Sequence, residues 1–317
     1  TIGRRQRQMC IRDRNNMINT LEKSFKKIQS TIIKNFQLLE TSKNANISSD
    51  IWKRSEGGGG KTFVISNGSF FDNCAVNFSS IYGNKIPESA TAKKQLKQVN
   101  YGYQAMGVSV ICHPKNPYVP TSHMNIRLFG ILDKKGVIND WWIGGGYDLT
   151  PYIPFKDDIV DWHEAARDAM NCYNKNFYKK FSENCNKYFY LPHRSERRGV
   201  GGIFFDNLSS LSLEDSLNML NSVADTYLKS YLDIVLRRKT TKYSPNEKEF
   251  QLIRRGRYAE FNLIYDRGTA FGLQSNGRIE SILASLPSEV RWTYKKSNEY
   301  KSMEKKLLQV VNRDWNV

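Results

Sequence analysis

The sequence has few cysteines, and their spacing excludes several kinds of metal and redox centre. The five are scattered along the chain with no Cys-x-x-Cys pair: Cys10, Cys74, Cys112, Cys172 and Cys185. An odd, scattered set is typical of reduced thiols in a cytosolic protein. The spacing also argues against zinc ribbons and cysteine-ligated iron–sulfur centres. We therefore expect a cytoplasmic protein.

Long apolar runs are also missing. None approaches the roughly 20 residues that a membrane helix needs, so we expect no transmembrane segment. The basic stretch 1–14 lacks an apolar core and does not resemble a secretory signal. We interpret residues 1–16 as a non-native or disordered extension, with Met17 as a plausible start. No linker divides the rest, which predicts one domain over residues 17–317.

The sequence has fewer acidic than basic residues. The 317 residues include 48 basic and 31 acidic side chains, a formal net charge of +17. Such a balance favours acidic partners, namely nucleic acid, an anionic membrane or a polyanionic small molecule. The competing interpretation is a lysine-rich surface that simply faces water.

Hydrophobic periodicity predicts an α+β fold. Steps of three and four from Ile18 to Leu39 indicate an amphipathic helix. Further helices are predicted over 157–190, from Ser212, from Ser244 and over 298–313. Strands are predicted over 103–112, 123–132, 140–143, 202–205 and 257–265. With no βαβ alternation and no repeat, we expect a large, mostly antiparallel sheet sandwiched between helices.

The predicted strand 123–132 places polar side chains together. Alternation puts His123, Asn125 and Arg127 on one face and apolar side chains on the other. The preceding strand has small residues on one face, including Gly107 and Ser109, which leaves room for something flat and large. For the strand 123–132 the alternative interpretation is an ordinary solvent-facing sheet surface, and for the small residues it is close packing against a helix.

Glycine-rich segments carry further polar residues. Asp148 follows Gly144–Gly146 and could accept hydrogen bonds from N–H donors of a ligand, or could simply cap a turn. Arginines cluster beside glycines in 193–202, 254–257 and 266–278. Because guanidinium binds carboxylates bidentately, three such clusters favour recognition of a polyacid.

The histidines are His113, His123, His163 and His193. Their spacing matches no short metal motif, so proton transfer by one or two of them is the preferred interpretation. Two other classes of protein remain open. One is a metal-dependent hydrolase built on the four histidines, and the other is a non-catalytic basic module that binds nucleic acid in a salt-dependent way.

Five long segments resemble the oxygen-dependent coproporphyrinogen III oxidase family. They begin with GGGGKTFVISNGSFFDNCAVNFS, MGVSVICHPKNPYVPTSHMNIR and WWIGGGYDLTPY, and continue with HRSERRGVGGIFFD and RRGRYAEFNLIYDRGTAFGLQSNGRIESILASLPSEVRW. The resemblance runs from about Met17 to Val317. It implies a flat antiparallel sheet between helices, a homodimer with residues 258–293 as dimerisation segment, and no nucleic-acid partner.

The resemblance also implies the reaction. Two propionates of coproporphyrinogen III would be oxidatively decarboxylated to vinyl groups, giving protoporphyrinogen IX, carbon dioxide and hydrogen peroxide in haem synthesis. Oxygen would be the co-substrate, with no organic cofactor. The radical enzyme for the same conversion needs a cysteine-ligated cluster, for which this chain offers no ligands.

Site residues follow from the same resemblance. His123 would be the proton donor, and Asp148 would accept hydrogen bonds from the pyrrole N–H groups. The expected substrate contacts are Ser109, Asn125, Ile126, Arg127, Asn276, Gly277 and Arg278; Asn276 stands where the family usually has glycine. Bacterial members imply a divalent metal at His113, His123, His163 and His193, whereas eukaryotic members imply none. We expect Asp148→Ala to abolish turnover with the fold intact.

Overall fold

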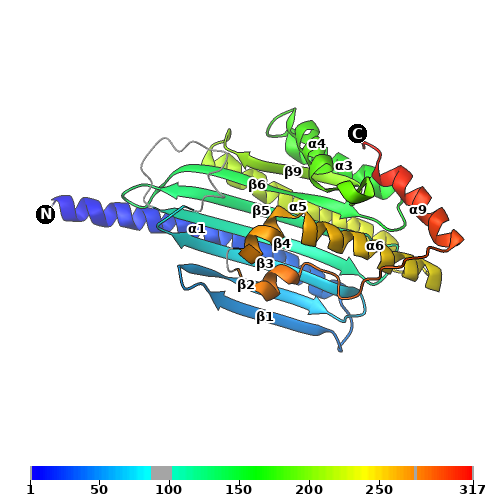
Figure 1. Cartoon of the computed structure of the whole chain (residues 1–317). Helices are drawn as coiled ribbons and strands as arrows, with labels where there is room; N and C mark the ends of the chain where they lie inside the picture. Colours follow the sequence, from blue (N-terminus) through cyan, green and yellow to red (C-terminus); the bar gives the residue numbers. More distant parts are fainter. Residues whose placement is uncertain (1, 87–101, 275–276, 316–317) are drawn as a thin grey trace.

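A large antiparallel sheet forms the centre of the protein (Figure 1). The computed structural model describes residues 2–86, 102–274 and 277–315, with the backbone alone at 2–16 and 271. Its strand order is β1-β2-β3-β4-β5-β6-β9, and all neighbouring strands are antiparallel. The strands are β1 Asn46–Lys53, β2 Gly58–Ser66, β3 Phe71–Gly83, β4 Tyr103–Pro114, β5 Thr121–Leu132, β6 Ile138–Thr150 and β9 Gly201–Leu208. A separate two-stranded ribbon pairs β7 Tyr190–Leu191 with β8 Glu196–Arg197.

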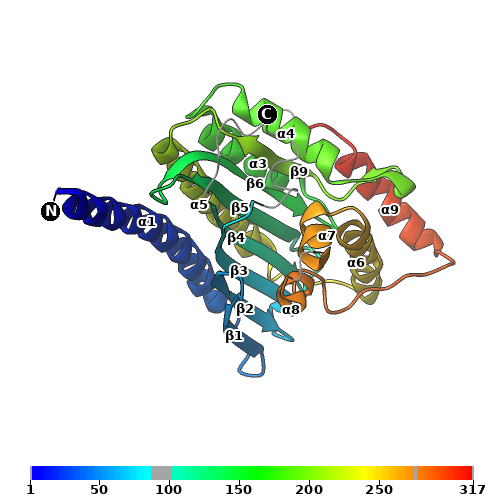
Figure 2. The ribbon, with the colours of Figure 1, turned by 60° about the vertical axis from the view of Figure 1, so that its left-hand side comes forward.

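Helices cover both faces of the sheet, which confirms the predicted α+β sandwich. Figure 2 shows α6, α7 and α8 on the opposite side of the sheet from α1. The helices are α1 Ile2–Leu39, α3 Lys156–Asn171, α4 Phe177–Tyr188, α5 Leu213–Arg238, α6 Pro245–Ile264, α7 Arg267–Gln274, α8 Ile279–Leu283 and α9 Asn298–Val311. A short 3-10 turn spans Pro192–Arg194. In the described part of the chain, no helix is both long and apolar enough to cross a bilayer.

Alternation along the strands separates a core face from a polar face. Met124, Ile126 and Leu128 of β5 are fully buried in the main core, which α1 and α5 complete. We call the side of the sheet that faces this core the back face. The intervening side chains of β5 point to the front face and are only half-buried. The front face is the side that α6 and α8 cover, since Tyr258 and Ala284 pack there against Ala75 and Ile111.

The prediction of a strand over 257–265 is wrong, because this segment belongs to α6. Every side chain from Phe250 to Asn262 is buried in α6. A helix that is buried all round has no apolar stripe to reveal its 3.6-residue period. The alternating polar residues of the segment therefore suggested a strand. Its start was predicted correctly, since Ser244 and Glu247 form a capping box.

Three other boundaries differ from the sequence-based predictions. The helix predicted over 157–190 is two helices, α3 and α4, separated by a turn at 172–176. The strand predicted over 140–143 continues as β6 through the glycines to Thr150. The helix predicted from Ile18 begins at Ile2 as α1, so it includes residues of the stretch interpreted as a non-native or disordered extension.

Glu40 joins the C-terminal end of α1 to the β2–β3 hairpin. Its carboxylate accepts hydrogen bonds from the backbone N–H groups of Ser42, Ser69, Phe70 and Phe71 and from the Ser69 hydroxyl. Partial burial alone would raise the pKa of Glu40, but these hydrogen bonds lower it to about 2. The ionised form therefore stabilises the docking of α1.

We expect this carboxylate to make the stability of the protein pH-dependent. Because the pKa of Glu40 is lower in the folded state, its contribution is complete above about pH 4.5 and is lost as the pH falls toward 2. Glu40→Gln should reduce the free energy of unfolding at neutral pH by roughly 1 kcal/mol and flatten its decrease between these pH values. Urea unfolding at a series of pH values measures both effects. Glu164→Gln is the control, since Glu164 pairs with Arg167 on the surface of α3; an equal effect there would contradict the assignment.

Candidate active site

A polar strip lies on the front face between two hydrophobic clusters. We use this name for Ser109 of β4 with His123, Asn125 and Arg127 of β5. The strands pair Ser109 with Asn125, so the predicted side chains do lie together on one surface. One cluster includes Tyr103, Phe129 and Trp142, and the other includes Ile111 and Tyr258. The strip is thus a polar floor with apolar walls at both ends.

His123, Asp148 and Arg198 form a chain of charged hydrogen bonds beside the strip. His123 is the register partner of Asp148 in β6, and its Nδ1 donates to Asp148 Oδ1 over 2.8 Å. Arg198 Nη2 donates to Asp148 Oδ2 over 2.7 Å. The side chains of Asp148 and Arg198 are 3% and 2% exposed, whereas that of His123 is 28% exposed. Of the three, His123 is therefore the group that a ligand can reach.

The Asp148 carboxylate is held ionised despite its burial. Desolvation alone would raise its pKa, but the Arg198 guanidinium and the His123 ring together lower it below the usual value. Aromatic rings surround Arg198 in turn, with Phe189, Tyr258 and Phe261 at 4.1, 4.3 and 4.8 Å from its guanidinium carbon. An ionised Asp148 can only accept, which fixes the proton of His123 on Nδ1. The Nε2 atom is then left for a ligand.

Arg127 lies across the strip and is positioned by its neighbours. Its guanidinium donates to Asn125 Oδ1 and to Asp206 Oδ1, each over 2.8 Å. The register partner of Arg127 is Gly144, and a Cβ at Gly144 would lie 2.6 Å from Arg127 Nη2. The glycine thus makes room for the guanidinium. A carboxylate ligand could join or replace Asp206 there.

The second predicted substrate segment lies at the start of α8. Arg278 donates to Asp50 Oδ2 of β1 over 2.8 Å. Its Nη1 is buried, and no acceptor among the described residues reaches it. Gly277 precedes it in a turn in which its N–H donates to Gly272. Asn276 lies outside the described residues.

Ile126 does not share the polar strip. Its side chain is fully buried in the back-face core, because successive residues of a strand point to opposite faces. Any contact of Ile126 with a ligand on the front face would have to come from its backbone.

The structure does not bring the four histidines together. His113 donates to Ser285 O and contacts Thr121, and burial lowers its pKa to about 3. His163 donates to Val200 O and contacts Tyr178, and burial lowers its pKa to about 4. His193 contacts Tyr265 and Glu260. Among the described residues, no group of three or more His, Cys, Asp or Glu side chains could hold a metal ion. The described residues of the chain therefore do not fit the four-histidine site that the resemblance implied.

Most of the clustered arginines bind the protein's own carboxylates instead of a ligand. Arg194 and Arg257 pair with Glu260, Arg197 with Asp314, Arg254 with Glu196, and Arg255 with Asp72. These five ion pairs do not support the polyacid interpretation of the clusters, since sequence spacing does not show which carboxylates the fold brings near. Arg127 and Arg278 also pair with carboxylates, Asp206 and Asp50, but Arg127 belongs to the polar strip and Arg278 has a buried Nη1 without an acceptor among the described residues. These two remain candidates for a ligand.

Sequence reasoning missed the individual role of Arg198, which it treated as one member of a basic cluster. It also missed Asp206, the carboxylate that positions Arg127. No local pattern distinguishes Arg198 from Arg197. Only the pairing of β6 with β9, preceded by the turn through residues 198–200, places its side chain beside Asp148.

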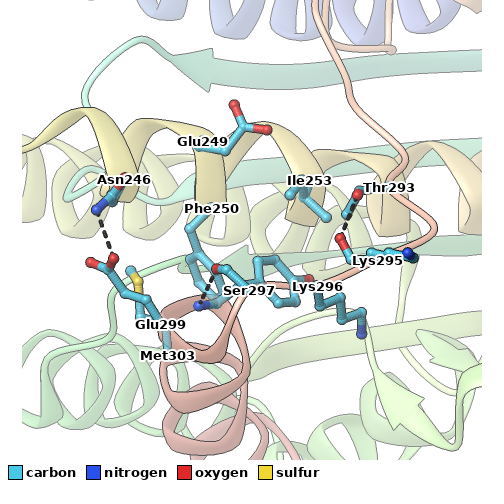
Figure 3. Close-up of a pocket in the computed structure, with 11 residues that line it drawn as sticks. Asn246, Glu249, Phe250, Ile253, Thr293, Lys295, Lys296, Ser297, Glu299 and Met303 are labelled. Carbon is cyan, nitrogen blue, oxygen red and sulfur yellow. Dashed lines mark hydrogen bonds between the residues drawn. The ribbon is translucent and has the colours of Figure 1, made fainter.

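A hollow of about 180 Å³ lies elsewhere, between α6 and α9 (Figure 3). Phe250, Tyr300 and Met303 line it together with polar side chains from both helices and the preceding loop. It contains none of the predicted site residues, so we do not assign the reaction to it.

On the front face of the sheet, an ionised carboxylate thus orients a histidine, and Arg127 lies on the same face. The chain belongs to the coproporphyrinogen III oxidase family, whose model, described as Coproporphyrinogen III oxidase, matches residues 20–316. The match covers nearly the whole chain. The protein is thus an oxidative decarboxylase of porphyrin biosynthesis, and the polar strip lies within the matched region.

Proposed function

We propose that this enzyme uses molecular oxygen to convert two propionates of coproporphyrinogen III into vinyl groups, giving protoporphyrinogen IX. In each round the propionate loses carbon dioxide and one hydrogen from its β-carbon, and oxygen takes up two electrons and two protons to form hydrogen peroxide. The porphyrinogen is itself the reductant, so no organic cofactor is needed. The family match, together with the polar strip that it includes, carries this proposal.

The cysteines support the oxygen-dependent form of the reaction. A radical enzyme would need several cysteines around one iron–sulfur cluster. Cys74, Cys112 and Cys185 are buried, Cys172 is exposed, and these four are free thiols. In sequence the five cysteines are far apart, with no Cys-x-x-Cys pair. Free thiols also fit a cytoplasmic enzyme.

The strip suggests a division of labour among its residues. Arg127 and Arg278 would bind propionates, because guanidinium matches carboxylate geometry. Ser109 and Asn125 would contact the macrocycle above them. His123, oriented through Nδ1 by Asp148, would move a proton at Nε2. Asp148 is itself covered and both of its oxygens are engaged. We therefore assign it to the orientation of His123 in place of the pyrrole contact that the resemblance suggested.

The surface formed by the end of α6, by α7, α8 and the following loop supports the binding of a second copy of the chain. Half of the exposed large hydrophobic side chains of the described residues lie here: Leu263, Ile264, Leu273, Ile279, Leu283, Trp292 and Tyr294. They overlap the segment 258–293, for which the resemblance implies dimerisation. Clustered apolar exposure is typical of interfaces. We propose a homodimer, which light scattering of the purified protein would test; a monomer at micromolar concentration would contradict it.

The reaction is tested by comparing air with argon. Purified enzyme and coproporphyrinogen III should give protoporphyrinogen IX and hydrogen peroxide in air, measured by mass spectrometry after re-oxidation. Under argon no product should form, even with S-adenosylmethionine and a reductant. Product under argon with those additions would refute oxygen dependence. No product under either condition would refute the decarboxylation.

Gly144→Ala should weaken substrate binding with little effect on folding. The new methyl would displace the Arg127 guanidinium, the mobile end of a flexible side chain. We expect the KM for coproporphyrinogen III to rise about tenfold, as for a lost charged hydrogen bond, with kcat changed less. Steady-state kinetics measures both, and thermal unfolding checks the fold. An unchanged KM would show that Arg127 does not hold the substrate in this position.

A further inference from the structure

A row of polar side chains crosses the front face from the edge strand to the polar strip. Register pairs Asp50 of β1 with Thr62 of β2, Thr62 with Asn77 of β3, and Asn77 with Ser109. Ser109 pairs in turn with Asn125. Neighbouring strands lie about 4.8 Å apart, so Asn77 is one strand spacing from Ser109 and roughly 10 Å from Asn125. Asn77 therefore lies within the floor that a flat macrocycle over the strip would cover.

The edge of this row is bound to α8. Asp50 accepts from Arg278, and the Thr62 hydroxyl lies 2.7 Å from that of Ser281. Asn77 takes part through its amide nitrogen, since Nδ2 donates to Ser281 O over 3.1 Å. This bond fixes which way the amide points, because the carbonyl of Ser281 can only accept.

The other end of the Asn77 amide is unsatisfied. Its Oδ1 is buried, and no donor among the described residues reaches it. A buried acceptor in this state calls for a donor, and a ligand on the front face can supply one. Asn77 is also the member of the row nearest to Ser109, on the side toward α8.

We propose that Asn77 is a substrate-binding residue whose Oδ1 accepts a hydrogen bond from a pyrrole N–H of the porphyrinogen. The inference rests on the proposed function. Ionised propionates can only accept, so the ring N–H groups are the donors that this substrate offers. Asp148, the alternative acceptor, has both oxygens engaged by His123 and Arg198. Arg278 Nη1 is likewise buried, and no acceptor among the described residues reaches it. A propionate of the substrate would supply that acceptor.

Asn73 provides a matched control on the same strand. Its Nδ2 donates to Ala284 O and Leu286 O, so it holds the segment after α8 as Asn77 holds α8. Asn73 pairs with His113, outside the polar row. We expect Asn77→Ala to raise the KM for coproporphyrinogen III about tenfold, with kcat within about threefold. Asn73→Ala should change the KM by less than twofold. Equal changes of KM in the two variants would overturn the proposal, because Asn77 would then only hold α8.

A binding cycle identifies the donor. Coproporphyrin III retains pyrrole N–H groups, and its copper(II) complex has lost them while keeping the four propionates. Calorimetry should show that the wild type binds the free base several-fold more tightly than the copper complex, and that Asn77→Ala removes this preference. A preference that survives in Asn77→Ala would overturn the proposal. A wild type that neither binds coproporphyrin III nor turns over its porphyrinogen would refute the proposed function itself, and the inference with it.

Discussion

Arg198→Met is expected to lower the free energy of unfolding by about 3–5 kcal/mol and to abolish turnover. The substitution keeps much of the side-chain volume but leaves the Asp148 carboxylate buried without its cation. Removing one partner of a buried ion pair is far more damaging than the net contribution of the pair suggests. Asp148 is 3% exposed on its side chain and cannot turn to water. The hydrogen bond by which Asp148 orients His123 depends on the ionised form of the Asp148 carboxylate.

Urea unfolding and steady-state kinetics would measure the two effects. Arg197→Met is the matched control, since Arg197 is the adjacent residue and its partner Asp314 is 64% exposed. An exposed pair contributes about 0–1 kcal/mol, so this variant should remain close to the wild type. Similar losses in both variants would mean that the pairing of Arg198 with Asp148 is not the cause.

The buried guanidinium of Arg198 also changes the expected outcome of Asp148→Ala. The sequence predicted lost turnover with an intact fold. The structure shows that this variant would leave the Arg198 guanidinium buried with only Asn262 as a polar partner among the described side chains. We therefore expect a less stable protein as well as an inactive one. Thermal unfolding of Asp148→Ala would test this revision; an unchanged melting temperature would restore the original expectation.

His123→Gln is expected to reduce kcat by a factor of roughly 10²–10⁴ while the protein remains folded. This is the range for removing a general acid or base. Glutamine can still donate to Asp148, and Asp148 keeps Arg198, so no buried charge is left unpaired. The partial exposure of His123 limits the loss of packing.

His193→Gln is the control for this prediction. His193 bonds to Glu260 and Tyr265 and belongs to no site that we use. It should keep most of the activity. If both variants lost activity equally, the four histidines would have to act as one site, which the arrangement within one subunit does not support.

The sequence predicted the sheet and the polar strip well because strand alternation is a local signal. Knowing that 123–132 is a strand suffices to place His123, Asn125 and Arg127 on one face and Ile126 on the other. The capping residues Ser212 and Ser244 also marked two helix starts correctly.

The parts that the sequence could not predict depend on contacts between distant segments. Arg198 and Asp148 are 50 residues apart, and only the fold shows that they pair. The 3.6-residue period of α6 could not be recognised in the sequence, because the middle of the helix is buried all round. Its buried arginines Arg254 and Arg255 are bonded to carboxylates from β3, β8 and α9. Asn77 carried no local signal. Its unsatisfied Oδ1 becomes visible only once β3 is paired with β4 and α8 is in place.

The central claim is that the polar strip binds a porphyrinogen whose propionates oxygen then converts to vinyl groups. Single-turnover mixing tests it most directly. Enzyme in excess would be loaded with coproporphyrinogen III without oxygen, then mixed with oxygenated buffer and quenched at intervals. We predict that vinyl-containing product appears only after oxygen is added, and that His123→Gln binds the substrate but forms product at least a hundredfold more slowly. Product that forms before oxygen, or at the wild-type rate in His123→Gln, would contradict the account.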